Sequence, residues 1–190
     1  MPLRIFSGER KGLKLHLPPN PSFKPTQAKV REAIFSVLGG FEVGKKALDL
    51  YAGSGAMGLE AFSRGALSAL FVDDSPEAVN ILGKNLALFS AKENELKVLK
   101  LKLPEGLSRL KSFSPFDLVF MDPPYRLELS PGENLKKLIE LKLLNPGSLL
   151  TWEMDAKCLP GVDPNLYPGF PLFKTKTWGS KGAAFFVREP

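Results

Sequence analysis

The segment that most constrains the fold is a glycine-rich turn between an apolar, strand-like run and a helix-like run. It reads Leu48-Asp-Leu-Tyr-Ala-Gly-Ser-Gly-Ala-Met-Gly58, and its glycines have the G-x-G-x-x-G spacing of a nucleotide-cofactor loop. Such a loop joins a strand to a helix and leaves the cofactor at the carboxyl end of that strand. The segment therefore predicts an α/β domain with a cofactor site near residue 53.

Strand-like and helix-like segments alternate through the rest of the chain, which indicates a parallel sheet with right-handed crossovers. A closing hairpin is predicted from segments 170–177 and 183–187. The other predicted strands are 47–51, 67–72, 96–101, 116–121 and 148–153, and the predicted helices are 57–64, 76–89, 104–110 and 134–144.

The N-terminal part has a different pattern. Segments 3–6 and 12–17 predict two short strands joined by a turn at Gly8, and the proline-rich segment 18–25 cannot be helical. A helix capped by Thr26 and ended by Gly39-Gly40 should follow. We expect residues 1–25 to form an appendage of hairpin and linker, and residues 26–190 to form the main domain.

The net charge of +6 lies entirely in residues 1–46, which hold nine basic and three acidic side chains. A basic appendage on a neutral body fits a polyanionic partner. A solubilising surface is the alternative that composition leaves open. The candidate phosphate contacts on or beside the predicted hairpin are Arg4, Arg10, Lys11 and Lys14.

The composition excludes several classes of protein. No apolar run reaches the roughly 18 residues that a membrane span needs, and the N-terminus lacks the apolar stretch of a signal peptide. The single cysteine, Cys158, cannot form an internal disulfide, and the single histidine, His16, lacks neighbours for a metal site or a serine triad. We expect a cytoplasmic protein without a membrane segment or a metal.

Two carboxylates near the glycine loop indicate which cofactor it binds. Asp73 should end the second strand, 20 residues after Gly53, where it can accept hydrogen bonds from a ribose diol of either NAD or S-adenosylmethionine. Asp49 separates these two cofactors, because its charge would oppose a pyrophosphate. S-adenosylmethionine has no phosphate and carries an ammonium and a sulfonium, so Asp49 favours it over NAD.

A second motif, Asp122-Pro-Pro-Tyr125, follows the strand predicted at 116–121. The two prolines remove backbone donors, so the loop offers mainly acceptors: the Asp122 carboxylate and the Pro123 carbonyl. Two acceptors can hold both N–H bonds of an aromatic amine and point its lone pair at a methyl donor, while Tyr125 offers a ring on which a flipped base can stack. The motif predicts methyl transfer to an exocyclic amine, with a simple proline turn as the alternative.

At these motifs the chain resembles the class I methyltransferases that modify exocyclic amines, and more closely the RsmD family. Members of that family methylate the 2-amino group of a guanine in bacterial small-subunit ribosomal RNA. The resemblance runs from Arg4 to about Leu150. Its specific segments are 4–8 (RIFSG), 11–15 (KGLKL), 24–38 (KPTQAKVREAIFSVL) and 48–66 (LDLYAGSGAMGLEAFSRGA).

The resemblance implies a Rossmann-like fold with a mostly parallel seven-stranded sheet, preceded by the N-terminal hairpin and helix. It implies S-adenosylmethionine as cofactor, S-adenosylhomocysteine as product and no metal. Lys102-Leu103 stands where the family has an acidic or amide residue, so backbone contacts would have to recognise adenine. The implied cofactor residues are Asp49, Tyr51, Ala52, Gly53, Ser54, Gly55, Asp73 or its neighbour Asp74, and Leu103.

The resemblance also makes Asp122, Pro123, Pro124 and Tyr125 the catalytic loop. It adds two phosphate contacts to the hairpin residues: Arg31, and Lys24, which stands where the family has arginine. The expected partner is ribosomal RNA, either free or in an assembled small subunit or its precursor, and we expect a monomer. An adenine-N6 DNA methyltransferase and a non-catalytic RNA-binding protein with this fold are the alternatives.

Overall fold

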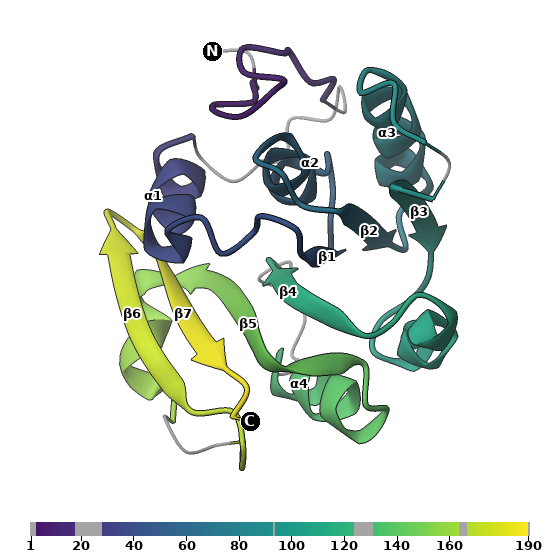
Figure 1. The fold of residues 1–190 in the computed structure, drawn as a ribbon. Coiled ribbons are helices and arrows are strands. Elements are labelled where there is room, and N and C mark those ends of the chain that lie inside the picture. Colours follow the sequence, from purple (N-terminus) through teal and green to yellow (C-terminus); the bar gives the residue numbers. More distant parts are fainter. Residues whose placement is uncertain (1–2, 18–27, 93, 124–130, 164–166, 190) are drawn as a thin grey trace.

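The computed structural model describes residues 3–17, 28–92, 94–123, 131–163 and 167–189 (Figure 1). No helix in these ranges is long and apolar enough to cross a membrane. The helices are α1 Ala28–Leu38, α2 Ala56–Ser63, α3 Pro76–Ala87 and α4 Pro131–Glu140, with 3₁₀ helices η1 Glu105–Ser112 and η2 Ala156–Gly161. The strands are β1 Lys46–Leu50, β2 Ser68–Asp73, β3 Leu96–Lys100, β4 Phe116–Met121, β5 Leu144–Asp155, β6 Leu172–Trp178 and β7 Lys181–Val187.

The seven strands form one sheet in the order β3-β2-β1-β4-β5-β7-β6. Strands β1 to β5 are parallel, and β7 runs antiparallel to both β5 and β6. The predicted seven-stranded, mostly parallel sheet is therefore confirmed, with the antiparallel part at its C-terminal end. The strand order reverses between β1 and β4, and such a switch point is where open α/β sheets bind ligands.

Helices cover both faces of the sheet (Figure 1). Helices α1, α2 and α3 pack on one face, and η1, α4 and η2 pack on the other. Successive side chains of a strand point to opposite faces. Leu48 and Leu50 of β1 belong to the core under η1 and α4, whereas Ala47 belongs to the core under α1 and α2. Asp49 therefore points toward α1 and α2.

Strand β5 is longer than predicted. The Pro146-Gly147 segment, predicted as a turn before the strand, lies inside it. Gly147 adopts a φ of +74°, and the pairing of β4 with β5 shifts register between Phe116 and Leu118. A bulge accommodates residues that do not fit a regular ladder, so the strand passes through a sequence that is typical of a turn.

The N-terminal hairpin is less regular than predicted but is part of the core. Its two arms pair through one antiparallel bridge between Arg4 and Lys14 instead of through full strands. Leu3, Ile5 and Leu15 are buried in the same cluster as helices α1 to α3. The boundary near residue 25 therefore marks no break in the hydrophobic core.

Polar side chains of two helices bind the backbone of the hairpin. The Glu60 carboxylate of α2 accepts hydrogen bonds from the backbone N–H groups of Phe6 and Ser7, at 2.8 and 3.0 Å. Asn85 of α3 accepts one from His16 N–H at 2.7 Å and donates to the carbonyl of Ser54, in the glycine loop, at 2.8 Å. The side chain of Asn85 thus connects the hairpin to the loop.

Candidate active site

The site lies where β1 and β4 end, beside the C-terminal part of β5. The parallel register pairs Leu50 of β1 with Met121, and Met121 with Trp152 of β5. Asp122 directly follows β4, and Glu153 is the next residue on β5, so the register brings them to the same level of the sheet. Because side chains alternate along a strand, both lie on the face that Asp49 occupies.

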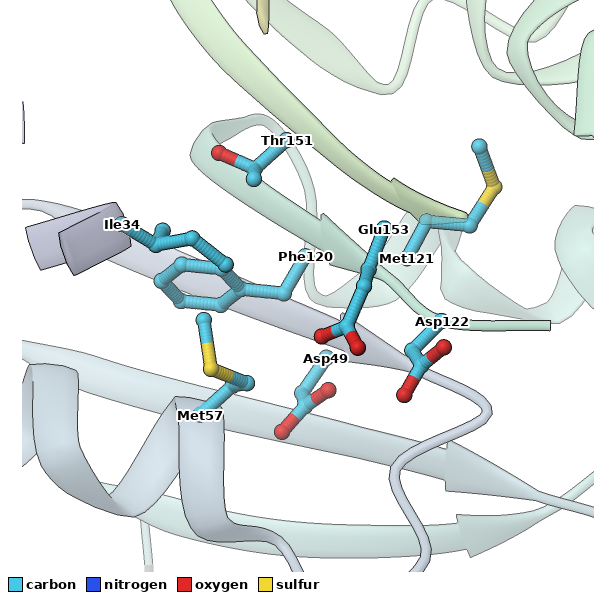
Figure 2. A pocket seen from close by; sticks show the side chains of 8 residues that line it. All are labelled: Ile34, Asp49, Met57, Phe120, Met121, Asp122, Thr151 and Glu153. Atoms are coloured by element: carbon cyan, nitrogen blue, oxygen red, sulfur yellow. The ribbon is translucent and has the colours of Figure 1, made fainter. Parts of the chain in front are cut away.

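A pocket at this edge contains three carboxylates. Asp49, Asp122 and Glu153 come from three adjacent strands, and Figure 2 shows their carboxyl groups directed toward a common space. Within the described ranges no group of His, Cys, Asp and Glu side chains is arranged to hold a metal ion. The arrangement suits a cationic or hydrogen-bond-donating ligand. The rest of the lining consists of Ile34, Met57, Phe120, Met121 and Thr151.

Asp49 is 4% exposed, and its Oδ2 accepts a hydrogen bond from the Gly58 N–H at 2.8 Å. Burial raises the pKa of Asp49 to about 8 and outweighs the lowering by that hydrogen bond, and the charges of Asp122 and Asp73 raise it further. A cation in the pocket would stabilise the ionised form. Asp49 is therefore suited to a positively charged ligand, and its contact with a cofactor stays a prediction.

The glycines of the loop have packing roles as well. Gly55 has a φ of +77°, and a Cβ there would lie 2.5 Å from Cδ2 of Leu82. A Cβ on Gly58 would lie 2.5 Å from the ring of Phe71. Close packing against α3 at Gly55 and against β2 at Gly58 thus explains these two glycines without a ligand. Gly53, with a φ of +55°, lies in the turn itself.

Asp73 ends β2, as predicted, and organises the loop. Its two carboxylate oxygens accept hydrogen bonds from the N–H groups of Gly53 and Ser75, at 2.9 and 3.0 Å. Burial is the main cause of its raised pKa. A carboxylate has about four acceptor positions, so Asp73 can still accept from a ribose. Asp74 is exposed beside it, and the choice between the two as ribose ligand stays a prediction.

Tyr51 begins the loop in a strained conformation. Its φ of +59° is rare for a residue with a side chain and is often found at functional sites. Its hydroxyl accepts a hydrogen bond from Asn134 of α4 at 2.9 Å, and burial is the main cause of its raised pKa. The Ala52 N–H donates to the Val72 carbonyl at 3.1 Å. The loop is thus fixed from both of its flanks.

The side chain of Leu103 does not lie on the side of the sheet toward which Asp49 points. It is buried in the core under η1 and α4. Its neighbour Lys102 forms an ion pair with Glu105 at 3.8 Å on the surface. If Leu103 contacts a cofactor, the contact would therefore be made by its backbone, and this contact stays a prediction.

A model of the family described as conserved hypothetical protein 95 matches residues 3–187. The chain belongs to this family. It is the RsmD family that the motifs resemble, so that prediction is confirmed. The shared fold is the Rossmann-like fold of methyltransferases.

Two curated relatives carry the name ribosomal RNA small subunit methyltransferase D. The Escherichia coli protein is 37% identical over 188 residues, which cover 98% of this chain and 90% of that protein. The Haemophilus influenzae protein is 30% identical, over 93% of this chain and 89% of that one. The solved structure of the Escherichia coli protein yhhF superimposes with a TM-score of 0.83 at 30% identity, over 100% and 99% of the two chains.

The catalytic loop expected for the RsmD family begins at the pocket. Asp122 lines it directly after β4, and Pro123 follows. Pro124 and Tyr125 lie outside the described residues, so stacking of a base on Tyr125 stays a prediction.

The basic residues expected to contact RNA divide into two groups. Arg10, Lys11 and Lys14 are exposed on the hairpin, and Arg4 is partly buried with its guanidinium donating to the Gly12 carbonyl at 2.8 Å. Arg31 is fully buried: it lies 3.9 Å from the Glu60 carboxylate and over the ring of Phe6. Its side chain connects the N-terminal hairpin to α1 and is not at the surface. Lys24 lies outside the described residues.

Sequence reasoning missed Glu153 and Thr151, which line the pocket from β5. The strand was recognised, but its polar side chains were not connected with the site. The available signal was a glutamate at the end of an apolar run, on the strand predicted to follow the catalytic one.

Proposed function

We propose that this RsmD-family protein transfers a methyl group from S-adenosylmethionine to the exocyclic 2-amino group of a guanine in small-subunit ribosomal RNA. The observation that carries the proposal is the position of Asp122, in one pocket with Asp49 and beside the glycine loop. The names of the curated relatives support ribosomal RNA as the substrate. Such a substrate would place the protein in the cytoplasm.

The residues present fit S-adenosylmethionine. The pocket gathers carboxylates, and the cofactor carries an ammonium and a sulfonium, so its charge complements the site. Asp49 and the backbone of Gly53 and Gly55 would hold the methionine end. Asp73 would hold the ribose, and the backbone at Leu103 would contact the adenine.

Bound to these residues, S-adenosylmethionine would supply the methyl group, its sulfur would keep the electron pair of the broken bond, and the methylated guanine nitrogen would then lose one proton to solvent. The protein's part is orientation. Asp122 and the Pro123 carbonyl accept the two amine N–H bonds, which localises the nitrogen lone pair and aims it. Because a carboxylate acceptor is charged, it forms the stronger kind of hydrogen bond.

Replacing Asp122 by asparagine tests the proposal. We expect kcat to fall about tenfold to a hundredfold, because one charged acceptor is lost, while the affinity for S-adenosylmethionine changes little. Transfer of a labelled methyl group to free small-subunit RNA, to isolated small subunits and to DNA should be measured in parallel, followed by mapping of the modified base. Asp163→Asn, at an exposed position near η2, is the matched control.

Two results would contradict the proposal. Methylation of DNA with none of RNA would indicate an adenine-type enzyme. Cofactor binding without transfer to any of these substrates would indicate a binding protein that keeps the fold.

A further inference from the structure

Glu153 is a buried carboxylate in the pocket that the proposed reaction leaves without a role. It is 4% exposed, and its Oε1 lies 3.1 Å from the Nζ of Lys181 on β7, which is 20% exposed. The ammonium favours the ionised form of the carboxylate, which accepts hydrogen bonds and donates none. A charged acceptor is therefore maintained beside Asp122.

A second side chain on β5 supports a ligand at this place. Thr151 is 2% exposed and lines the same pocket (Figure 2), and its hydroxyl has no hydrogen-bond partner among the described residues. Buried polar groups are nearly always hydrogen-bonded, so an unpaired hydroxyl in a pocket indicates a partner that binds there.

The position of β5 identifies this partner as the methyl acceptor. The glycine loop follows β1, and β4 lies between β1 and β5 in the sheet. Glu153 and Thr151 thus lie on the side of Asp122 that is away from the loop. A ligand that contacts Asp122 and Glu153 together would occupy the substrate side of the pocket.

We propose that Glu153, held by Lys181, accepts the N1–H of the guanine whose 2-amino group is held by Asp122. The inference rests on the function proposed above and assigns the residue that selects the base. Guanine presents N1–H and the 2-amino group side by side on its Watson–Crick edge, which is the edge that flipped bases present to such pockets. Two carboxylates on adjacent strands complement these donors.

The same geometry rejects adenine. Adenine presents a lone pair at N1, next to its 6-amino group, and a carboxylate facing that lone pair would be repelled. Glu153 therefore distinguishes a guanine-N2 enzyme from an adenine-N6 enzyme that uses the same Asp-Pro-Pro-Tyr loop. A polar site that is complementary to one base rejects the mismatched one strongly, because its buried groups are left unpaired.

Glu153→Gln tests the assignment with two RNAs, one carrying the mapped guanine and one carrying 2-aminopurine at that position. 2-Aminopurine keeps the amine that is methylated but has a lone pair at N1. The wild-type protein should prefer guanine in kcat/KM by about tenfold to a hundredfold. The glutamine can donate from its amide, so the variant should reduce this preference by at least about tenfold. The fluorescence of 2-aminopurine gives its binding without cofactor, and the variant should bind that RNA more tightly than the wild type.

The controls separate this inference from the proposed function. Glu140→Gln, on the surface of α4, should keep the wild-type preference. If Glu153→Gln does not fold, the pair Glu153→Gln with Lys181→Met removes both charges and leaves no buried ion unpaired. An equal loss of activity on both RNAs, with the preference unchanged, would overturn the role of Glu153 while the proposed function stands. A wild-type protein that does not methylate guanine RNA would overturn the proposed function, and this inference with it.

Discussion

Asp49 combines two requirements that oppose each other. It must be buried so that Gly58 can bond to it and fix the start of α2, yet a buried carboxylate without a cation is costly to ionise. Its pKa is raised to about 8 mainly because burial disfavours the ionised form. The residue is therefore expected to reduce the stability of the empty protein in order to attract a positively charged ligand.

The raised pKa makes a prediction about stability. In the unfolded chain an aspartate has a pKa of about 3.9, so between about pH 4 and 8 the folded protein keeps a proton that the unfolded chain has released. The free energy of unfolding should fall as pH rises through this window, by up to about 1.4 kcal/mol per pH unit from this group, and level off above pH 8. Urea unfolding from pH 5 to 9 should show a shallower fall for Asp49→Asn. Identical curves for both proteins would contradict the assigned pKa.

At the scale of elements, Glu60 joins three segments. It accepts from the hairpin backbone, lies beside Arg31 of α1 and pairs with Arg64 at 2.8 Å, and both Glu60 and Arg31 have fully buried side chains. Burial lowers the pKa of Arg31, and the Glu60 charge opposes that shift. The N-terminal hairpin is therefore fixed by an internal charge cluster as well as by apolar packing.

Glu60→Gln should destabilise the protein by about 3–5 kcal/mol, because it removes the carboxylate charge that lies beside the buried Arg31 guanidinium. The free energy of unfolding from urea titrations measures the effect. Glu77→Gln, an exposed change in the first turn of α3, should cost less than about 0.5 kcal/mol. A small effect at Glu60 would mean that the hairpin is held by its apolar side chains alone.

The elements themselves were largely predictable. β4 was predicted with the bounds Phe116–Met121 that it has, and Ser75 caps α3 with its side chain on Ala78 N–H, because local pattern and capping decide both. The start of β5 was not predictable, since its bulge at Gly147 depends on pairing with β4. The burial of Arg31 was missed for the same reason: its carboxylate partner is distant in sequence.

At the scale of the whole molecule, the N-terminal hairpin contributes both exposed basic side chains and buried apolar side chains. Leu3, Ile5 and Leu15 point inward while Lys11 and Lys14 are exposed. Removing residues 1–20 would therefore remove part of the core together with the charges. A loss of RNA binding in such a truncated protein would not separate lost charge from lost stability, so point substitutions are the sharper test.

Lys11→Ala combined with Lys14→Ala should weaken RNA binding and flatten its salt dependence. Each lost phosphate contact should lower the slope of log K against log salt by about 0.7 on single strands or 0.9 on duplex. Affinity for small-subunit RNA across a salt series measures both quantities. Lys136→Ala with Lys137→Ala, on the exposed side of α4, is the matched control. An unchanged slope would indicate that the hairpin lysines only solubilise the protein.

The overall architecture was predictable from the alternation of strands and helices, and the candidate site residues Asp49, Asp73 and Asp122 were recognisable from motifs near strand ends. Glu153 was not recognisable in this way, because its proximity to Asp122 depends on the lateral order of the strands, which places β5 beside β4. A sequence records which residues end strands, but the side-by-side order of those strands is a property of the assembled sheet.

The contact of Gly8 with α2 has a consequence for saturation mutagenesis. Gly8 is exposed, sits among basic residues, and has a φ of +79°, yet a Cβ there would lie 1.7 Å from the Ser63 carbonyl oxygen. A survey of all single variants should find this surface position intolerant of every substitution. Such a score would resemble that of a nucleic-acid contact, although its origin is the docking of the hairpin on a helix. At the charged neighbours Arg10 and Lys11, the kinds of side chain that are tolerated should therefore be compared before intolerance is attributed to a nucleic-acid contact.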